Sequence, residues 1–264
     1  LAASGAAPHV EGKDLMRGDC WWRYALSEEG AEIIHDALRE RDVEPVFQSG
    51  VDRFEVDDDG VVTGATDPNG DFYEGDFVGV AIGLDFNTEF LRGSGIELDD
   101  GIVTDEHMRT NAEDVYAAGD ITQFEDLILG ERAQNGAWGS AKEQGSTAGT
   151  NMVRDLEHDG VTDEAEEFRW VSSYSITHFD FPFLSFGHPT LGDDSAERKY
   201  DDGTWRRVAL KDGRVVGGVL IGDLSAQSVL KKLARKRLDG SDKTGLLLEE
   251  GVSIEQCEDA ATVN

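Results

Sequence analysis

The sequence has little cysteine, and what it has is poorly placed for a disulfide framework or a metal site. Cys20 and Cys257 are the only two in 264 residues, and neither has a second cysteine at CxxC or metal-ligand spacing. Among the six histidines, His178 lies near Asp180 but shows no ligand pattern, so we interpret both as surface or core polar residues. The sequence therefore predicts no metal site.

Positive charge is scarce as well. The chain has 24 Lys and Arg residues against 55 Asp and Glu residues, a formal net charge of -31 and a pI near 4.3. Phosphate backbones and anionic lipid surfaces are bound through clustered Lys and Arg side chains. The composition therefore argues against a nucleic-acid partner and against a membrane-surface partner.

Such acidity can mark a disordered chain, but 39% apolar residues and five Trp supply enough core-forming material to fold. We interpret the charge as a halophilic surface, because the Debye length falls to about 3 Å in molar salt and crowded carboxylates then repel each other weakly. No run reaches the ~18 consecutive apolar residues of a membrane span, and no secretion signal is evident. We therefore expect a cytoplasmic protein.

The first part of the chain predicts alternating strands and one helix. Lys13–Arg17 and Val43–Phe47 are of strand length, and Ser27–Arg41 predicts a helix capped by Ser27. Its apolar face would carry Ile33, Ile34, Ala37 and Leu38.

A β-meander is predicted next, because β-prone runs are separated by Asp-Gly and Asn-Gly turn residues. Its strands would be Val51–Val56, Val61–Thr66, Asp71–Tyr73 and Phe77–Ile82. The last of them is apolar on both faces, which is typical of a strand that enters the middle of a buried parallel sheet.

The second half predicts more strand and turn over Ile102–Gly119 and then a helix over Asn135–Val153. The small-residue face of that helix would carry Ala137, Ala141, Ala148 and Met152. Near the C-terminus, Arg206–Leu210 and Val215–Ile221 predict a hairpin, and Ser225–Arg237 predicts a helix. Beyond Asp239 the signals are weak.

The most specific motif is Thr110–Asp120, in which a threonine and a turn precede an expected buried strand that ends in Gly119 and Asp120. Ligands in open α/β sheets bind outside the carboxyl ends of strands, where a glycine permits close approach and an acid accepts sugar hydroxyls. The stretch resembles the second FAD-contacting motif of the pyridine nucleotide-disulfide oxidoreductase superfamily. That resemblance implies that Asp120 binds the ribityl chain, with Gly119 and Ile121 beside it.

A second stretch, Ala137–Gly145, resembles the helix that presents its N-terminus to the flavin pyrimidine ring in rubredoxin reductase-like and NADH oxidase-like members. Ala137 and Trp138 would then border the cofactor, and the positive end of the helix would favour an anionic reduced flavin. Taken alone, Trp138 is better explained as a core aromatic.

Val80–Asn87 resembles the crossover from the NAD(P) domain back to the FAD domain, with Gly83 and Leu84 near the nicotinamide nucleotide. Phe86 stands where the family usually has proline, and an ordinary strand end is the alternative. No GxGxxG turn occurs in the sequence, although this fold cradles each pyrophosphate on such a turn. We therefore expect an N-terminally truncated sequence.

The expected fold class is α/β: a partial Rossmann-like, two-dinucleotide-binding flavoprotein with a β-meander, followed by a C-terminal α+β domain. The expected parts are a partial NAD(P)-binding domain (1–83), the end of the FAD-binding domain (84–153), a linker (154–167), an interface-like α+β domain (168–240) and a tail (241–264).

The resemblance implies a flavin-dependent oxidoreductase that uses FAD and NAD(P)H, with a small-molecule or protein electron acceptor, and it allows a homodimer. It names no catalytic acid, base or nucleophile here. Arg17 does not decide between NAD and NADP, and the basic face of the last helix is either solvated or a docking site for an acidic carrier. The alternatives are a non-catalytic, regulatory partner-binding protein with a flavoprotein fold, or an inactive remnant.

Overall fold

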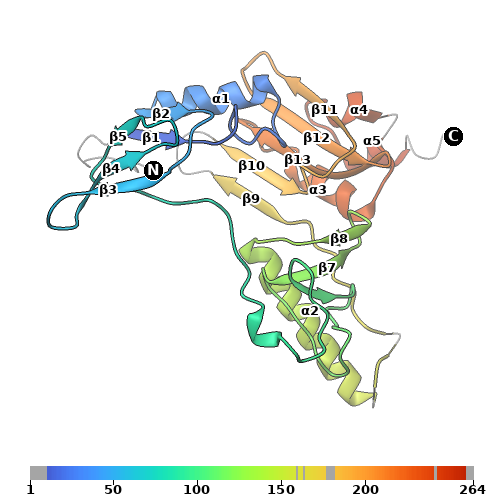
Figure 1. The fold of residues 1–264 in the computed structure, drawn as a ribbon. Helices are drawn as coiled ribbons and strands as arrows, with labels where there is room; N and C mark the ends of the chain where they lie inside the picture. The colour runs from blue at the N-terminus through green and yellow to red at the C-terminus, as the bar shows by residue number, and fades with distance from the viewer. Residues whose placement is uncertain (1–10, 159, 163, 177–181, 241–242, 260–264) are drawn as a thin grey trace, which may run out of the picture. The chain divides into compact units, whose positions relative to one another are not determined.

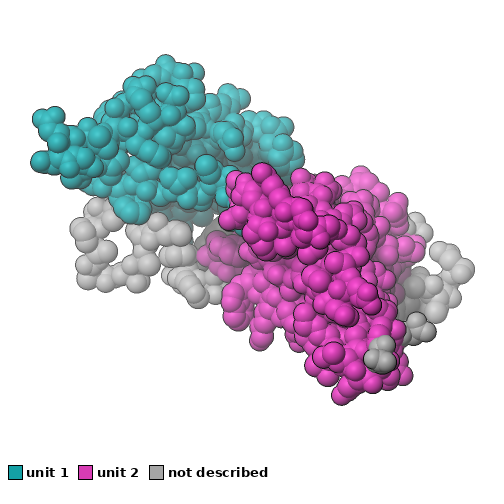
Figure 2. Space-filling model, turned by 60° about the horizontal axis from the view of Figure 1, so that its bottom comes forward, with its two compact units in different colours: residues 1–84 teal, residues 85–264 magenta. Residues whose placement is uncertain are grey.

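The computed structural model describes residues 11–158, 160–162, 164–176, 182–240 and 243–259. The chain divides into two compact units, Leu1–Leu84 and Asp85–Asn264 (Figure 2). Figure 1 labels most of the helices and strands of both units. His178 and Asp180 lie outside the described residues.

The first unit begins with a parallel strand pair joined by a helix, β1 (Gly12–Leu15), α1 (Glu28–Arg39) and β2 (Val43–Val46). The predicted cap is confirmed, because the Ser27 hydroxyl accepts a hydrogen bond from the Gly30 backbone N–H. The buried face of α1 is shifted from the predicted one, since only Ile34 of the four expected residues is fully buried. The buried residues are Gly30, Ala31, Ile34 and His35.

The first three strands of the predicted meander are confirmed as an antiparallel sheet in the order β3 (Arg53–Val56), β4 (Val62–Thr66) and β5 (Phe72–Glu74). Its turns form through local aspartates: the Asp57 carboxylate accepts from the backbone N–H groups of residues 59 and 61, and Asp67 accepts from those of residues 69 and 71. These turn bonds explain why the meander could be predicted from local sequence.

The predicted strand Phe77–Ile82 is wrong. In the described part of the chain this segment pairs with no strand, and 86% of Phe77 and 80% of Ile82 are exposed. Apolar residues form a buried strand only where neighbouring strands accept their backbone hydrogen bonds and cover both faces. The sheet of β1 and β2 contains two described strands and does not include this run.

The second unit begins with a short 3-10 turn, η1 (Glu89–Leu91), and a small mixed sheet. β6 (Ile102–Thr104) is parallel to β7 (Thr122–Asp126), which is antiparallel to β8 (Glu131–Ala133). Helix α2 (Trp138–Glu157) packs on this sheet through a core that includes Met108, Phe124, Ala148 and Phe168 (Figure 1).

The C-terminal part is a five-stranded antiparallel sheet in the order β11-β12-β13-β10-β9. Its strands are β9 (Ser173–Ile176), β10 (Phe183–Gly187), β11 (Asp194–Lys199), β12 (Trp205–Lys211) and β13 (Arg214–Ile221). The predicted hairpin between β12 and β13 is confirmed, with Asp212 and Gly213 both at positive φ, as a type I′ turn requires.

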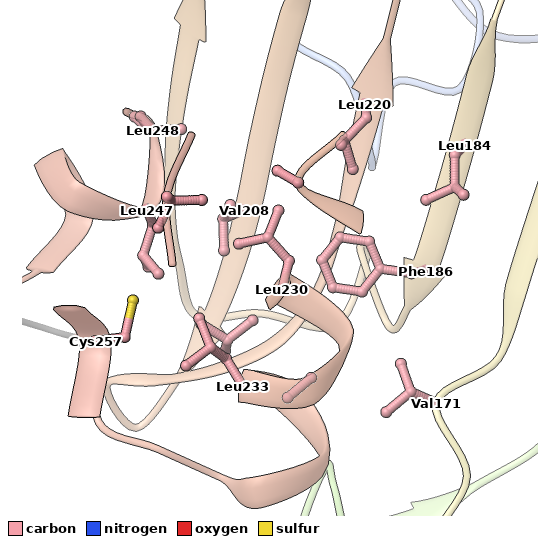
Figure 3. Packing of buried hydrophobic residues seen from close by; sticks show 14 of the residues in the cluster. Val171, Leu184, Phe186, Val208, Leu220, Leu230, Leu233, Leu247, Leu248 and Cys257 are labelled. Atoms are coloured by element: carbon pink, nitrogen blue, oxygen red, sulfur yellow. The ribbon is translucent and has the colours of Figure 1, made fainter. Parts of the chain in front are cut away.

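Three helices cover this sheet, α3 (Gln227–Lys236), α4 (Thr244–Leu247) and α5 (Ile254–Asp259). Figure 3 shows Leu230 and Leu233 of α3 packed against Phe186 and Val208 of the sheet. The last residues contribute more than their weak sequence signals predicted. Leu247, Leu248, Val252 and Cys257 are all buried in the same core.

The β7–β8 hairpin is attached to the C-terminal sheet by a buried hydrogen bond between two side chains. His188 Nε2 lies 2.6 Å from Asp126 Oδ2, while Asp126 Oδ1 accepts from the backbone N–H groups of Ile128 and Leu129. Burial alone would raise the pKa of Asp126, but the bond from His188 and the two backbone donors hold it below its usual value. Asp126 therefore caps its own turn and joins the two sheets.

Within the described residues, no helix is both long enough and apolar enough to cross a bilayer.

Candidate functional site

The segment before Gly119 is a hydrogen-bonded loop. Val115 is 36% exposed, and the only β pairing here is an isolated bridge between Arg109 and Tyr116 in the described chain. The Thr110 hydroxyl and backbone N–H both donate to the Val115 carbonyl, which closes the loop. The predicted buried strand is therefore wrong, because this carbonyl bonds within the loop instead of to a neighbouring strand.

A polar cluster attaches this loop to α2. Arg109 donates to both carboxylate oxygens of Asp155, and the Tyr116 hydroxyl donates to the same carboxylate. Burial raises the pKa of Tyr116, and its bond to Asp155 raises it further. Burial alone would raise the pKa of Asp155, but the bonds from Tyr116 and Arg109 lower it. The Asp155 carboxylate is thus ionised and fixed in place.

Gly119 and Asp120 follow in a turn that needs glycine. Gly119 has φ = +103°, a backbone conformation that L side chains rarely adopt. A Cβ built at Gly119 would meet no described atom within 4 Å, so the space beside it is open. Asp120 and Ile121 are half-buried, and among the described residues no hydrogen bond or ion pair involves the Asp120 carboxylate.

The turn is held from both sides of Gly119. Its backbone N–H donates to Gln144 Oε1 at 2.8 Å, and its carbonyl accepts from the Thr122 backbone N–H at 2.9 Å. Gln144 lies on α2, is completely buried, and donates from Nε2 to Ser140 Oγ. Gln144 was not predicted from the sequence, because its spacing of four residues from Ser140 shows a shared helix face but not that this face is buried against the turn.

The buried face of α2 is polar, and this corrects the predicted small-residue face. Of the four predicted residues only Ala148 is buried, while Met152 is 42% exposed. The reason is that this face contacts loop backbone, whose N–H and C=O groups require partners. Its buried residues are Ser140, Gln144, Thr147, Ala148 and Asn151.

The other expected site residues are more exposed. Ala137 is the N-cap of α2, and in the described structure no side chain caps this end of the helix. Trp138 in the first turn is 82% exposed, with Lys142 Nζ 5.9 Å from its ring centroid, so it is not a core aromatic. Gly83 and Leu84 belong to the first unit and are exposed there. The structure thus brings Gly119, Asp120 and Ile121 together in one turn beside α2.

No three His, Cys, Asp or Glu side chains of the described residues gather as a metal site would require. The two cysteines form no disulfide, and Cys20 is half-buried whereas Cys257 is buried. The described site therefore offers a turn and a helix end for an organic ligand, and its polar groups are backbone N–H groups and one carboxylate.

A family model described as pyridine nucleotide-disulphide oxidoreductase matches residues 19–145, which include the Gly119 turn and the start of α2. This part of the chain is therefore similar to a family of oxidoreductases. The resemblance seen in the sequence is thereby confirmed.

Individual curated proteins are also similar to this chain. The chain is 28% identical over 209 residues to pyridine nucleotide-disulfide oxidoreductase domain-containing protein 1 of Pongo abelii, covering 71% of this chain and 39% of that protein. It is 31% identical over 152 residues to an NAD(P)H sulfur oxidoreductase (CoA-dependent) of Pyrococcus abyssi, covering 56% of this chain and 33% of that protein. The chain thus spans less than half the length of these curated relatives.

Among solved structures, a covalent complex of putidaredoxin reductase with putidaredoxin contains a similar chain. The TM-score is 0.79 with 20% identity, over 97% of this chain and 59% of that one. At this identity the likeness concerns the fold, and it confirms the predicted α/β, Rossmann-like class.

Proposed function

We propose that the protein is an FAD-dependent NAD(P)H oxidoreductase and that the Gly119–Asp120 turn is part of its flavin site. The observation that carries this proposal is the half-buried Asp120 carboxylate, which has no partner among the described residues and follows a glycine with open space beside it. Similarity to a family of oxidoreductases supports the same function. When bound, FAD supplies the redox chemistry by accepting a hydride from NAD(P)H and passing electrons to an acceptor.

The residues of the turn fit a flavin in two ways. An ionised carboxylate accepts hydrogen bonds only, so Asp120 suits the hydroxyl groups of a ribityl chain. Gly119 would allow the cofactor to approach the backbone without a clashing side chain, and the half-buried Ile121 would lie beside it. Asp120 would therefore bind and orient the cofactor without transferring a proton.

The start of α2 would help to orient the pyrimidine ring of the flavin, whereas Asp120 would bind the ribityl chain. The helix has 20 residues, and its N-terminus carries a partial positive charge that no side chain neutralises within the described structure. A negative charge that develops beside Ala137 would be stabilised there, and the exposed indole of Trp138 offers a flat apolar surface. These two residues would thus favour the reduced form of a bound flavin.

Gly83 and Leu84 are our candidates for contact with the nicotinamide nucleotide. Gly83 resembles Gly119 in backbone conformation, with φ = +105° and no described atom within 4 Å of a built Cβ. We also propose that residues 1–83 belong to an NAD(P)-binding part and residues 84–153 to an FAD-binding part. We assign no pyrophosphate-binding turn to these residues, because the sequence contains no GxGxxG.

The acceptor belongs to the class of small molecules or electron-carrier proteins. One relative is named as a subunit of NADH-dependent phenylglyoxylate dehydrogenase, and one structural neighbour is a reductase joined to putidaredoxin. Both names support electron transfer to a further component.

The test is flavin binding and reduction in the full-length protein. We expect a visible flavin absorption band that NADH or NADPH bleaches under anaerobic conditions. D120A should weaken FAD binding at least tenfold, because the ribityl hydroxyls lose a charged acceptor. D114N alters an exposed carboxylate in the same loop and should bind FAD like the wild type.

Three results would contradict the proposal. A flavin band that neither nucleotide bleaches would favour a regulatory, partner-binding protein. A full-length protein that binds no flavin would favour an inactive remnant. Equal FAD affinity for D120A and the wild type would remove Asp120 from the site.

A further inference from the structure

The buried face of α2 carries a line of polar side chains, of which Gln144 and Asn151 bind loop backbone and Ser140 accepts a hydrogen bond from Gln144. Gln144 and Asn151 are completely buried, and Ser140 is 1% exposed. Burying an amide costs free energy unless its donors and acceptor find partners, and an apolar residue here would leave the contacted loop backbone groups unpaired. The presence of amides indicates that this face selects particular loop conformations.

The two amides hold different loops. Gln144 Oε1 accepts the Gly119 N–H at 2.8 Å, and Nε2 donates to Ser140 at 3.1 Å. Asn151 donates to the carbonyls of His107 and Glu166 and accepts from the Glu166 N–H. One helix face therefore contains an amide directed at the proposed flavin turn and a second amide directed elsewhere.

We propose that Gln144 is the positioning residue for the flavin turn, a role that rests on the proposed function. Its bond fixes the peptide between residues 118 and 119, and the Thr122 N–H fixes the Gly119 carbonyl on the other side. Gly119 is the most flexible residue type and would otherwise sample many conformations. Held at both ends, it directs the Asp120 carboxylate toward the cofactor.

This role predicts a specific pattern of FAD affinity in the full-length protein. Q144A leaves the Gly119 N–H without its partner and should weaken FAD binding about tenfold or more. N151A is the matched control, because it removes an amide with more hydrogen bonds from the same helix face. N151A should lower the thermal midpoint of the FAD-free protein at least as much as Q144A, yet bind FAD within about threefold of the wild type.

Two further variants separate positioning from general destabilisation. Q144E keeps an oxygen acceptor for the Gly119 N–H and should recover most of the affinity that Q144A loses. The double variant D120A/Q144A should bind FAD no more weakly than D120A, because Gln144 acts through the turn that carries Asp120. If Q144A does not fold, the same comparison is made between Q144E and Q144M, which is similar in size but lacks a strong acceptor.

The proposal would be overturned if losses of affinity followed losses of thermal stability across Q144A and N151A. Additive effects in D120A/Q144A, or equal weakness of Q144E and Q144M, would also overturn it. A wild-type protein that binds no FAD is a different result, since it would remove the proposed function itself. Isothermal titration with FAD and thermal melts of the FAD-free protein provide both measurements.

Discussion

Two apolar runs of this chain have similar sequences and opposite environments. Phe77–Ile82 and Val215–Ile221 both combine Val and Ile with glycine. The second lies within β13, between β10 and β12, and all of its residues are buried. The first pairs with no strand in the described chain, and Phe77, Val80 and Ile82 are exposed.

The difference shows that an apolar run is able to form a buried strand but does not guarantee one. β13 has a hairpin partner only two residues away, so its first neighbour is provided by the local turn at Asp212 and Gly213. Phe77–Ile82 has no such neighbour, and partners for it would have to come from distant sequence. Variants made in matched pairs in the two runs test this comparison.

The largest effect is expected from a buried charge. Val219 in β13 is completely buried, whereas Val80 is 62% exposed. V219D should lower the free energy of unfolding by about 4 kcal/mol or more, and V80D should change it by less than about 0.5 kcal/mol. Urea unfolding followed by circular dichroism in molar KCl measures both. A large loss in V80D would mean that this segment is covered in solution.

Replacing glycine with alanine, which adds one methyl group, should give a smaller difference in stability between the two runs. A Cβ at Gly218 would lie 2.4 Å from the Arg207 carbonyl oxygen, whereas at Gly79 the nearest atom is 3.8 Å away, on Phe77. G218A should therefore destabilise by about 1–3 kcal/mol. G79A should be neutral or stabilise by up to about 1 kcal/mol. Equal effects of the two substitutions in thermal melts would contradict the contrast in packing.

The buried pair between Asp126 and His188 links the C-terminal sheet to the β7–β8 hairpin, a contact that the exposed run lacks. D126N should lower the free energy of unfolding near neutral pH by about 1–2 kcal/mol. The pKa of Asp126 is lowered in the folded state, so its contribution is present above the ordinary aspartate pKa and is lost as pH falls through the folded-state value. The stability difference between wild type and D126N should shrink below about pH 4. A difference that stays constant down to lower pH would remove this role.

Salt should produce the most gradual effect, because it acts on the whole carboxylate surface. With a net charge of -31, the thermal midpoint should rise as KCl increases from dilute to molar. A midpoint that stays constant or falls would count against a halophilic surface. V80D adds one charge where 55 carboxylates already stand, so its salt dependence should match that of the wild type.

The candidate site was predicted in part. The Gly119–Asp120 turn and a following helix were located from sequence, because a Gly-Asp pair and a helix start are local patterns. The strand expected before the turn was wrong, since Tyr116 bonds to Asp155 on α2 instead of extending a sheet. Gln144 was missed because its partner is 25 residues away and a buried glutamine has no distinctive local pattern.

The sequence by itself determined the features whose hydrogen bonds close within a few residues: the Ser27 cap, the aspartate turns of the meander and the hairpin at Gly213. Only the tertiary structure decided which apolar runs were buried and why the inner face of α2 is polar. Whether a side chain is buried depends on groups that the fold brings together from distant positions in the sequence. Gln144 and Asn151 lie on that face because backbone N–H and carbonyl groups from distant loops would otherwise be buried without partners, which costs free energy. No local sequence pattern indicates this requirement.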